Sequence, residues 1–330
     1  MTDPTAGPAD PRNRLNDLTN REFMKQTKSF WWSRPDGEAP PLVSPELAAA
    51  FLRWCRENEG DEAVERWLGQ VTDSVLASVT PPRDKLKARH PATFSETDIE
   101  RLIRLFTKPG ERVLDPFLGS GSTLIACART GREGIGVELI PEWAQTARER
   151  IGAQRGDRPG QAALLPDAGP PLTVIEGDAR EATASLPDDS VHFLVTSPPY
   201  WSILGKKSGM KAKAEREAKG LPTKYSEHEA DLGNIADYDE FLEVLGAVFE
   251  ACARVLMPKR YACVIVSDFR HGPRFYLYHA DLARVLERHG YALKGITVLI
   301  QDNKNLYPFG IPFQFISNVH HQYILILQRA

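Results

Sequence analysis

The tetrapeptide Ser197-Pro198-Pro199-Tyr200 follows an apolar run and has the residue types needed to hold a planar, nitrogen-bearing ring. Two consecutive prolines fix the backbone and remove two N–H donors, which leaves carbonyl oxygens there to accept hydrogen bonds. Ser197 adds a small acceptor, and the rings of Tyr200 and Trp201 offer flat surfaces for stacking. A rigid pair of hydrogen-bond acceptors beside aromatic side chains suits a ring with an exocyclic amine. This turn therefore predicts a site that recognises or modifies a nucleobase.

A glycine-rich turn lies upstream of the tetrapeptide. The strand-like RVLDPF (112–117) runs into LGSGST (118–123) and then into a helical pattern. Glycines between a strand and a helix let the backbone approach a ligand closely. The turn has neither the GK[ST] of a P-loop nor the GxGxxG dinucleotide fingerprint. Asp115 precedes the glycines, where an acid repels a phosphate and attracts an amine, so the turn favours a ligand that carries an amino acid.

Two further acids stand at the ends of the next predicted strands. GIGVEL (134–139) contains Glu138, roughly 20 residues beyond the glycines, where an acid can bind ribose hydroxyls. VIEGDAR contains Asp178, which can accept a hydrogen bond from an adenine amine. Each acid also has a structural interpretation: Asp115 as a turn cap, Glu138 as a helix-start acid and Asp178 as an N-cap. Three acids at the ends of three consecutive strands favour a shared ligand over three separate capping roles.

The elements that must position these residues form an alternating pattern from about residue 96 onward. Seven strands are predicted, at 112–117, 134–139, 172–178, 191–197, 261–269, 292–300 and 322–329, with helices at 97–106, 122–131, 141–151, 238–256 and 279–290. This alternation predicts a doubly wound α/β sheet. The segment between the last two strands has no helical pattern, so we expect the last strand to pair antiparallel.

The N-terminal part has a different pattern. Residues 1–14 are rich in Pro, Asp and Ala, which predicts a disordered tail. Residues 15–88 carry apolar positions at helical spacing and predict a helical N-terminal region. No apolar run reaches the about 20 residues that span a bilayer, and the N-terminus does not resemble a secretory signal, so we expect a cytoplasmic protein. Four cysteines without CxxC spacing predict buried free thiols rather than a metal site.

The net charge of the chain is -3, but one segment has an excess of Lys and Arg over Asp and Glu. Residues 201–224 contain seven Lys and Arg residues and only two acids. Because this stretch directly follows the Ser-Pro-Pro-Tyr turn, it is a candidate for contacting phosphates near the site. A solvated insert explains the same composition equally well.

Several of these segments together resemble the S-adenosylmethionine-dependent DNA amino-methyltransferases. DPFLGSGST (115–123) looks like the cofactor motif of that family and TSPPYW (196–201) like its catalytic motif. ARHPATF (88–94) is similar to its additional cofactor-contacting segment, and HQYILILQR (321–329) to a late strand of its sheet. The resemblance implies a Rossmann-like methyltransferase sheet of seven strands, with the last strand antiparallel. It makes residues 89–330 the catalytic domain, with a basic insert at 201–235 and the helical N-terminal extension before it.

The resemblance also implies which residues hold S-adenosyl-L-methionine, which is converted to S-adenosyl-L-homocysteine, and it implies no metal. The predicted cofactor residues are His90, Pro91, Thr93, Phe94, Asp115, Pro116, Phe117, Gly119, Ser120, Gly121, Ser122, Thr123, Glu138, Leu139, Asp178 and Ala179. In the catalytic turn, Ser197 and the Pro198 carbonyl accept hydrogen bonds from the target amine. Pro199 completes the turn, and Tyr200 stacks on the base.

The implied reaction follows from the chemistry of an exocyclic amine, whose lone pair is delocalised into its ring. Two acceptors placed out of the ring plane localise that lone pair, so that it attacks the sulfonium methyl in line. The base must first leave the duplex. The residues that we expect to contact nucleic acid are Trp201, Lys206, Lys207, Lys211, Lys213, Asn303 and Asn305.

Serine in the first position of the tetrapeptide is the form usual among cytosine-N4 enzymes, and we expect that activity on double-stranded DNA. Adenine-N6 methylation, methylation of an RNA amine, and a non-catalytic cofactor-binding subunit of a defence system remain alternatives. A cytosine-C5 enzyme is excluded because no Pro-Cys pair occurs. Partners from a restriction or phage-defence system are expected and a membrane is not, whereas the sequence indicates neither oligomeric state nor recognition site.

The sequence departs from the family in two respects. The cofactor motif precedes the catalytic motif, whereas many SPPY enzymes have the reverse order. The sequence also ends at the last predicted strand, so we expect target recognition to come from elsewhere. The candidates are residues 15–88, the insert 201–235 and the loop 302–320.

Overall fold

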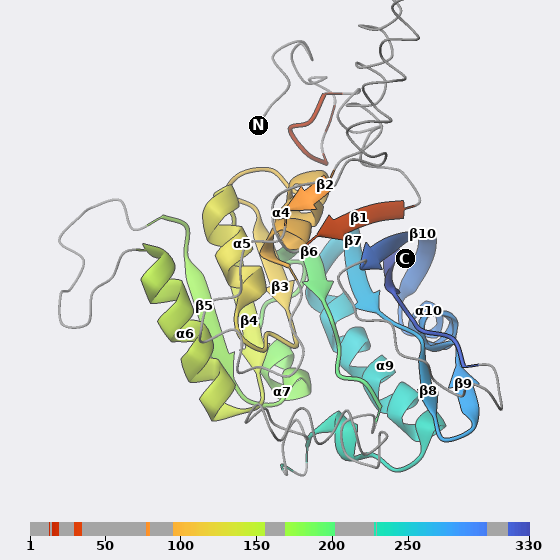
Figure 1. Cartoon of the computed structure of the whole chain (residues 1–330). Helices are drawn as coiled ribbons and strands as arrows, with labels where there is room; N and C mark the ends of the chain where they lie inside the picture. Colours follow the sequence, from red (N-terminus) through yellow and green to blue (C-terminus); the bar gives the residue numbers. More distant parts are fainter. Residues whose placement is uncertain are drawn as a thin grey trace, which may run out of the picture.

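A single large sheet organises the protein. The computed structural model describes residues 13, 15–19, 30–34, 77–79, 95–155, 169–201, 228, 230–301 and 316–330. The strands of the sheet are β1 (Phe30–Arg34), β2 (Ala77–Val79), β3 (Arg112–Asp115), β4 (Glu133–Glu138), β5 (Leu172–Glu176), β6 (Val191–Thr196), β7 (Leu256–Val266), β10 (Tyr291–Gln301) and β11 (His321–Arg329). Across the described part of the chain, their order is β2-β1-β10-β11-β7-β6-β3-β4-β5 (Figure 1).

The strand directions confirm the predicted doubly wound sheet. β3, β4, β5, β6 and β7 run parallel to one another, whereas β11 is antiparallel to both of its neighbours, β10 and β7. All seven predicted strands are present. The antiparallel direction of β11 agrees with the expectation from the sequence between the two strands, which has no helical pattern.

Two strands of this sheet were not predicted. β1 pairs parallel with β10, and β2 pairs parallel with β1, so both extend the sheet at its far edge. They lie within residues 15–88, which we predicted to be helical, and the prediction is wrong for these two short segments. Apart from them and residues 15–19, that region lies outside the described residues, as does nearly all of the predicted tail at 1–14.

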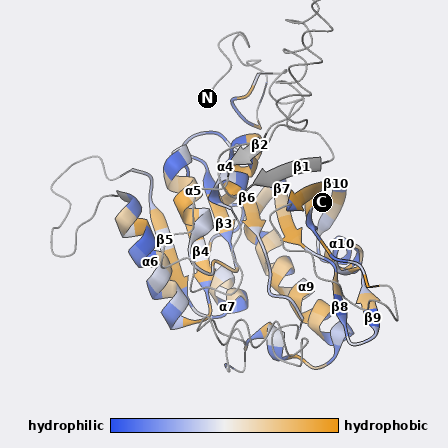
Figure 2. Ribbon diagram, viewed as in Figure 1, coloured by the Kyte–Doolittle hydropathy of each residue, from blue (hydrophilic) through white to orange (hydrophobic). Residues whose placement is uncertain are grey.

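Helices cover both faces of the sheet. One face carries α4 (Glu96–Phe106), α5 (Ser122–Thr130) and α6 (Pro141–Arg155), and the other carries α7 (Ala179–Ala184), α9 (Tyr238–Val255) and α10 (Tyr278–Arg288). Alternate residues of the central strands enter the two cores: Leu194 and Val264 pack under α9, and Phe193 and Cys263 pack under α4. Figure 2 shows the apolar strands between helices whose outer surfaces are hydrophilic. No helix in the described residues is both long and apolar enough to cross a membrane.

Polar N-cap residues precede several of the helices. Ser95 caps α4, Asp178 caps α7 and Asp237 caps α9, each through a side-chain oxygen that accepts a backbone N–H. The structure also contains three short elements that the pattern did not predict: α7, the 3-10 turn η2 (Leu232–Asn234), and a hairpin of β8 (Phe269–His271) and β9 (Arg274–Tyr276). Elements this short carry too few apolar repeats to show a period.

The topology brings the two sequence motifs together. The chain runs from β3 to β4 and β5 on one side, then returns to place β6 on the other side of β3. In open α/β sheets, ligands bind outside the carboxyl ends of strands at such a switch point. The glycine turn follows β3 and the Ser-Pro-Pro-Tyr turn follows β6, so both turns open onto this crevice.

Candidate active site

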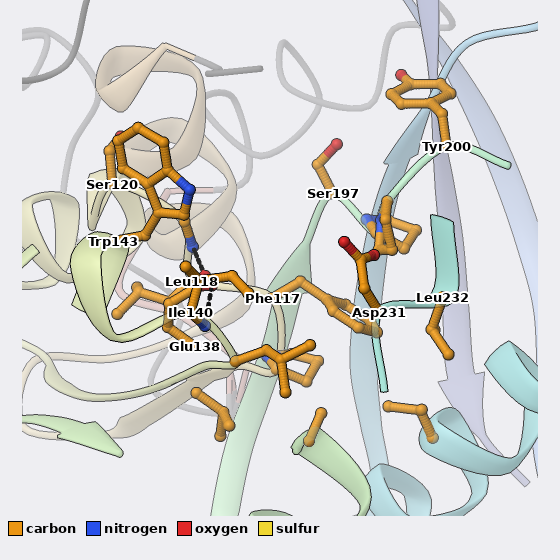
Figure 3. A pocket seen from close by; sticks show the side chains of 18 of the residues that line it. Phe117, Leu118, Ser120, Glu138, Ile140, Trp143, Ser197, Tyr200, Asp231 and Leu232 are labelled. Atoms are coloured by element: carbon orange, nitrogen blue, oxygen red, sulfur yellow. Dashed lines mark hydrogen bonds between the residues drawn. The ribbon is translucent and has the colours of Figure 1, made fainter. Parts of the chain in front are cut away.

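A cavity of about 530 Å³ lies at the carboxyl ends of the parallel strands and contains both motifs. Figure 3 shows Glu138 and Trp143 on one side, with Ser197 and Tyr200 across from them and Phe117 between. The predicted residues that line it are Pro116, Phe117, Gly119, Ser120, Ser122, Glu138, Leu139, Asp178, Ala179, Ser197, Pro198, Pro199 and Tyr200. The volume lies within the range of small-molecule sites.

Other predicted residues fall outside this cavity. Asp115, Gly121 and Thr123 lie behind its wall, in the turn that shapes it. The remaining positions lie outside the described residues: His90, Pro91, Thr93, Phe94, Lys206, Lys207, Lys211, Lys213, Asn303 and Asn305. Their predicted roles therefore stay predictions.

Asp115 is fully buried and holds the two turns together. Its Oδ1 accepts hydrogen bonds from the Phe117 backbone N–H at 3.0 Å and from the Thr196 hydroxyl at 2.6 Å, and its Oδ2 accepts one from the Thr123 hydroxyl at 2.5 Å. Burial raises the pKa of Asp115 to about 6, although these three donors act to lower it. Both oxygens thus accept from donors of the chain itself, in a geometry that positions the two turns. The predicted contact with the amino group of the cofactor stays a prediction.

The glycines of the turn adopt conformations that other residues avoid. Gly119 has φ +55° and Gly121 has φ +87°. A Cβ at Gly121 would also lie only 3.0 Å from the Ala147 Cβ of α6. Glycine at 121 therefore allows α5 to begin immediately after the turn while α6 packs closely against it.

Glu138 fixes the turn from the neighbouring strand. Its Oε2 accepts a hydrogen bond from the Gly119 N–H at 2.7 Å, and its Oε1 accepts one from the Ile140 N–H at 2.9 Å. The side chain also lines the cavity, so lone pairs that these donors do not use remain available for a ligand. Burial raises the pKa of Glu138 to about 7. Hydrogen bonds from hydroxyl groups of a ligand would therefore stabilise the ionised form of this carboxyl group.

A buried ion pair supports the glycine turn from behind. Arg150 of α6 pairs with Glu96 of α4 at 2.6 Å and also donates to the Ser120 carbonyl, while Ser122 donates to Glu96 at 3.0 Å. Both charged side chains are at least 96% buried. Sequence reasoning missed this pair. The signal was the position of Arg150 on the buried face of α6, three residues after Ala147 and seven after Trp143.

Asp178 has the capping role considered for it, and it also lines the cavity. It caps α7 by accepting from the Arg180 N–H at 2.8 Å, and its carboxylate pairs with the Arg180 guanidinium at 2.5 Å. This hydrogen-bonded guanidinium lowers the pKa of Asp178. Asp178 still lines the cavity, so its carboxylate is ionised and is oriented at the edge of the site.

The catalytic turn is framed by aromatic side chains. The Tyr278 hydroxyl donates to the Pro199 carbonyl at 3.3 Å. The Tyr200 ring meets Phe269 edge-on at 6.4 Å and Tyr278 at 5.9 Å between centroids. Gln322 of β11 donates to the Tyr200 hydroxyl at 3.4 Å. Ser197, Pro198 and Pro199 all line the cavity, and the Tyr278 hydroxyl fixes the position of the Pro199 carbonyl in the turn.

The structure corrects the prediction for Trp201. Its side chain is only 6% exposed, and its indole N–H donates to the Ile235 carbonyl at 3.0 Å. The ring packs against Tyr238 at 5.2 Å and His271 at 4.6 Å. Trp201 therefore belongs to the aromatic layer beneath the turn, which does not favour the predicted contact with nucleic acid.

Further residues of the cavity wall come from segments far apart in the sequence, and sequence reasoning missed them. They are Ile140, Trp143, Asp231, Leu232, Asp268, Gln301, Val319 and Gln322. Asp268 is 5% exposed, and its Oδ1 lies 2.7 Å from His279 Nδ1. No local motif marks such residues, because only the folded sheet brings β7, β10 and β11 to the same crevice.

The described residues contain no cluster of His, Cys, Asp and Glu that could hold a metal ion. Cys127, Cys252 and Cys263 are buried free thiols, which confirms the prediction for these three, whereas Cys55 lies outside the described residues.

Parts of the chain are similar in sequence to known proteins. Residues 10–149 match the model of the N6/N4 methylase family, described as DNA methylase. The Type II methyltransferase M2.DpnII of Streptococcus pneumoniae is 31% identical over 143 residues, which cover 43% of this chain and 48% of that protein. The Type II methyltransferase M.MjaI of Methanocaldococcus jannaschii is 36% identical over 94 residues, which cover 28% and 30%. The chain spans about half the length, or less, of these curated relatives.

A solved structure has a similar arrangement over part of the chain. A Thermus thermophilus protein described as a DNA modification methylase, in complex with S-adenosyl-L-methionine, is 25% identical and has a TM-score of 0.32. The overlap covers 46% of this chain and 53% of that one, and this TM-score is too low to support conclusions about the site. Over the matched residues, the chain is thus similar to the N6/N4 family of DNA methylases.

Proposed function

We propose that the protein transfers a methyl group from S-adenosyl-L-methionine to the exocyclic N4 of cytosine in double-stranded DNA. The observation that carries this proposal is the single cavity that contains both the glycine turn after β3 and the Ser-Pro-Pro-Tyr turn after β6. A cofactor half and an acceptor half in one cavity are what a direct transfer between two bound molecules requires.

The cofactor half of the cavity suits a nucleoside that carries an amino acid. Glu138 has free acceptor capacity for ribose hydroxyls, and Asp178 lies at the next strand end for an adenine amine. Trp143 and Ile140 provide apolar surface beside them, and Phe117 lies between the two halves. When bound there, the sulfonium of S-adenosyl-L-methionine supplies an electrophilic methyl group.

The acceptor half holds the base. Ser197 and the Pro198 carbonyl accept hydrogen bonds from the amine, and the Tyr200 ring offers its face to the base. Since Tyr200 is held by Gln322, Phe269 and Tyr278, the ring does not have to be ordered when the substrate binds. Acceptors placed in advance localise the lone pair of the amine without reorganisation during the reaction.

The cytosine-N4 assignment rests on Ser197 in the first position of the turn. Adenine-N6 methylation is the second candidate, since the family includes both reactions and the cavity wall suits either amine. An RNA amine and a non-catalytic cofactor-binding role rank after these two. The names of the relatives, Type II methyltransferases, favour a restriction-modification system with a cognate nuclease as partner. A DNA substrate means that we expect the protein to act in the cytoplasm.

The proposal is tested by incubating the full chain with unmodified genomic DNA and isotopically labelled S-adenosyl-L-methionine, then digesting the DNA to nucleosides for mass spectrometry. We expect labelled N4-methylcytosine. Labelled N6-methyladenine would move the assignment to the second candidate. Absence of label in DNA, together with label in a parallel RNA reaction, would overturn the proposed substrate.

A further inference from the structure

The β8–β9 hairpin (Phe269–Tyr276) begins directly after Asp268 of the cavity wall. Its strands pair Phe269 with Tyr276, Arg270 with Phe275 and His271 with Arg274. The loop between them contains two residues, and Gly272 has φ +59° at its first position. Two-residue hairpin turns need such a positive φ because it matches the twist of the strands. The hairpin therefore has a tight turn, and it lies near the carboxyl ends of the parallel strands (Figure 1).

The inner side of the hairpin is fixed to the catalytic turn. Phe269 is 7% exposed, lines the cavity and packs against Tyr200 and Trp201 at 6.4 and 6.5 Å. It also stacks on Tyr276 at 5.4 Å and an interplanar angle of 18°. Trp201 in turn contacts Tyr276 at 5.4 Å. These ring contacts hold the outer side of the hairpin at a fixed position beside the cavity.

The outer side combines positive charge with exposed apolar surface. Phe275 and Leu277, just beyond the hairpin, are the large hydrophobic residues that are exposed in the described part of the chain, at 37% and 53%. The Arg270 guanidinium lies over the Phe275 ring of the same face at 5.9 Å. Arg274 instead shares the inner face with Tyr276, over whose ring it lies at 4.6 Å, and it lines a second pocket with Asp237, Asp239 and Asp281. Residues 269–276 contain no acid, and within the described residues Arg270 forms no ion pair with a carboxylate.

We propose that the outer side of this hairpin contacts the nucleic acid around the base that enters the cavity. Arg270 binds a backbone phosphate, and the Phe275 ring stacks on a base beside the extruded one. Charge complementarity favours this partner, because an arginine beside an exposed aromatic ring attracts a polyanion whose bases can stack. Aromatic and apolar side chains inserted at a disturbed base step are a recurrent means of stabilising distorted DNA. The inference rests on the proposed function and names the surface through which its substrate is held.

The test compares single variants of the full chain. Arg270→Ala and Phe275→Ala change the outer side, and Arg104→Ala is the matched control. Arg104 is exposed in the last turn of α4, shortly before β3 begins. It therefore lies near the amino ends of the parallel strands, away from the cavity at their carboxyl ends. The measurements are KM for DNA in methyl transfer, DNA affinity as a function of salt, and the affinity for S-adenosyl-L-methionine by calorimetry.

We expect Phe275→Ala to weaken DNA binding about fivefold or more, as stacking contacts with bases do. Arg270→Ala should lower the slope of log affinity against log salt by about 1, because one phosphate contact is lost. Cofactor affinity should stay unchanged in both. If the wild-type protein methylates DNA and both variants behave like Arg104→Ala, the hairpin contact is wrong while the proposed function stands. If the wild-type protein neither binds nor methylates DNA, the proposed function fails and the hairpin contact fails with it.

A photocrosslink gives an independent measurement that does not depend on turnover. The photoreactive residue p-benzoylphenylalanine is introduced in place of Phe275, or in place of Arg104 as the control, and the full chain is irradiated with labelled duplex DNA. We expect crosslinked DNA from position 275 and none from position 104. A crosslink from position 275 to a second copy of the chain, without crosslinked DNA, would overturn the proposal.

Discussion

The Thr196 hydroxyl donates a hydrogen bond of 2.6 Å to the Asp115 carboxylate, and this bond joins the ends of β6 and β3. Thr196 immediately precedes Ser197 of the catalytic turn, and Asp115 immediately precedes the turn that contains the glycines. Because Asp115 also accepts from Thr123 at the start of α5, one buried carboxylate connects both halves of the cavity. The relative position of the two turns thus depends on a carboxylate that lies behind the cavity wall.

Thr196→Val tests this connection, because it removes the donor and nearly preserves the shape of the side chain. The buried carboxylate would lose one of its three donors, at a cost of about 1.5–3 kcal/mol in the free energy of unfolding. We expect kcat to fall more than the cofactor affinity. Denaturant unfolding, turnover and calorimetry check these effects, and Thr196→Ser, which keeps the hydroxyl, should behave like the wild type. Equal stability of the Val and Ser variants would contradict the role of the bond.

The raised pKa of Glu138 predicts that cofactor binding depends on pH. With a pKa of about 7 in the free protein, Glu138 is mostly protonated below pH 7. Ribose hydroxyls donate to the ionised form, so the affinity should be greatest above pH 7 and should fall as the pH drops below it, approaching about tenfold per unit. Calorimetry from pH 5.5 to 8.5 checks this, with Glu138→Gln expected to bind weakly and without pH dependence. An affinity that rises as the pH falls would contradict the assignment.

The same pKa shift of Glu138 makes the free energy of unfolding fall as the pH rises, whereas cofactor affinity is expected to rise. Because the folded state favours the protonated form of Glu138, its contribution to the free energy of unfolding is fully present below about pH 4.5. That contribution is lost as the pH rises through about 7. Glu138→Gln should therefore remove part of the decline in stability between these pH values, which denaturant unfolding across that range measures. An unchanged decline in the variant would show that Glu138 does not cause it.

The Arg150–Glu96 pair predicts a large effect of a residue that lies outside the cavity wall. Arg150→Ala removes one partner of a buried ion pair, which typically costs about 3–5 kcal/mol. The Ser120 carbonyl also loses a donor, so cofactor affinity should fall as well. Arg148→Ala is the matched control, because Arg148 lies on the same helix and pairs with Glu176 at the surface at 3.3 Å. We expect that variant to change stability by no more than about 1 kcal/mol. Similar losses in both variants would refute the role of the buried pair.

Gly121→Ala separates the two reasons for a glycine in the turn. At φ +87° an alanine costs about 1–2 kcal/mol, and its Cβ also meets Ala147 at 3.0 Å. Gly110 has a similar φ of +78° with nothing near its Cβ, so Gly110→Ala carries the backbone cost alone. We expect both variants to lose stability but only Gly121→Ala to lose cofactor affinity. Thermal unfolding and calorimetry of the two variants distinguish these effects.

Much of the fold and part of the site could be predicted because their signals are local. The seven strands have apolar runs bounded by turn residues, and the glycine turn and the Ser-Pro-Pro-Tyr turn are continuous in sequence. The burial of Trp201 could not be predicted, because its partners Tyr238 and Tyr276 are more than 30 residues away in the sequence. The same holds for Arg150, whose charge indicates a surface position until Glu96 of another helix is placed beside it.

The central claim is that one cavity binds the cofactor at the glycine turn and activates the amine at Ser197. The most direct measurement is single-turnover methyl transfer to DNA by Ser197→Ala, together with its affinity for S-adenosyl-L-methionine. Removing one preorganised polar contact from an active site typically lowers the rate about 100-fold or more. We predict a loss of that size with cofactor affinity within about twofold of the wild type, since Glu138 and the glycine turn are untouched. Methyl transfer by Ser197→Ala at the wild-type rate would contradict the account.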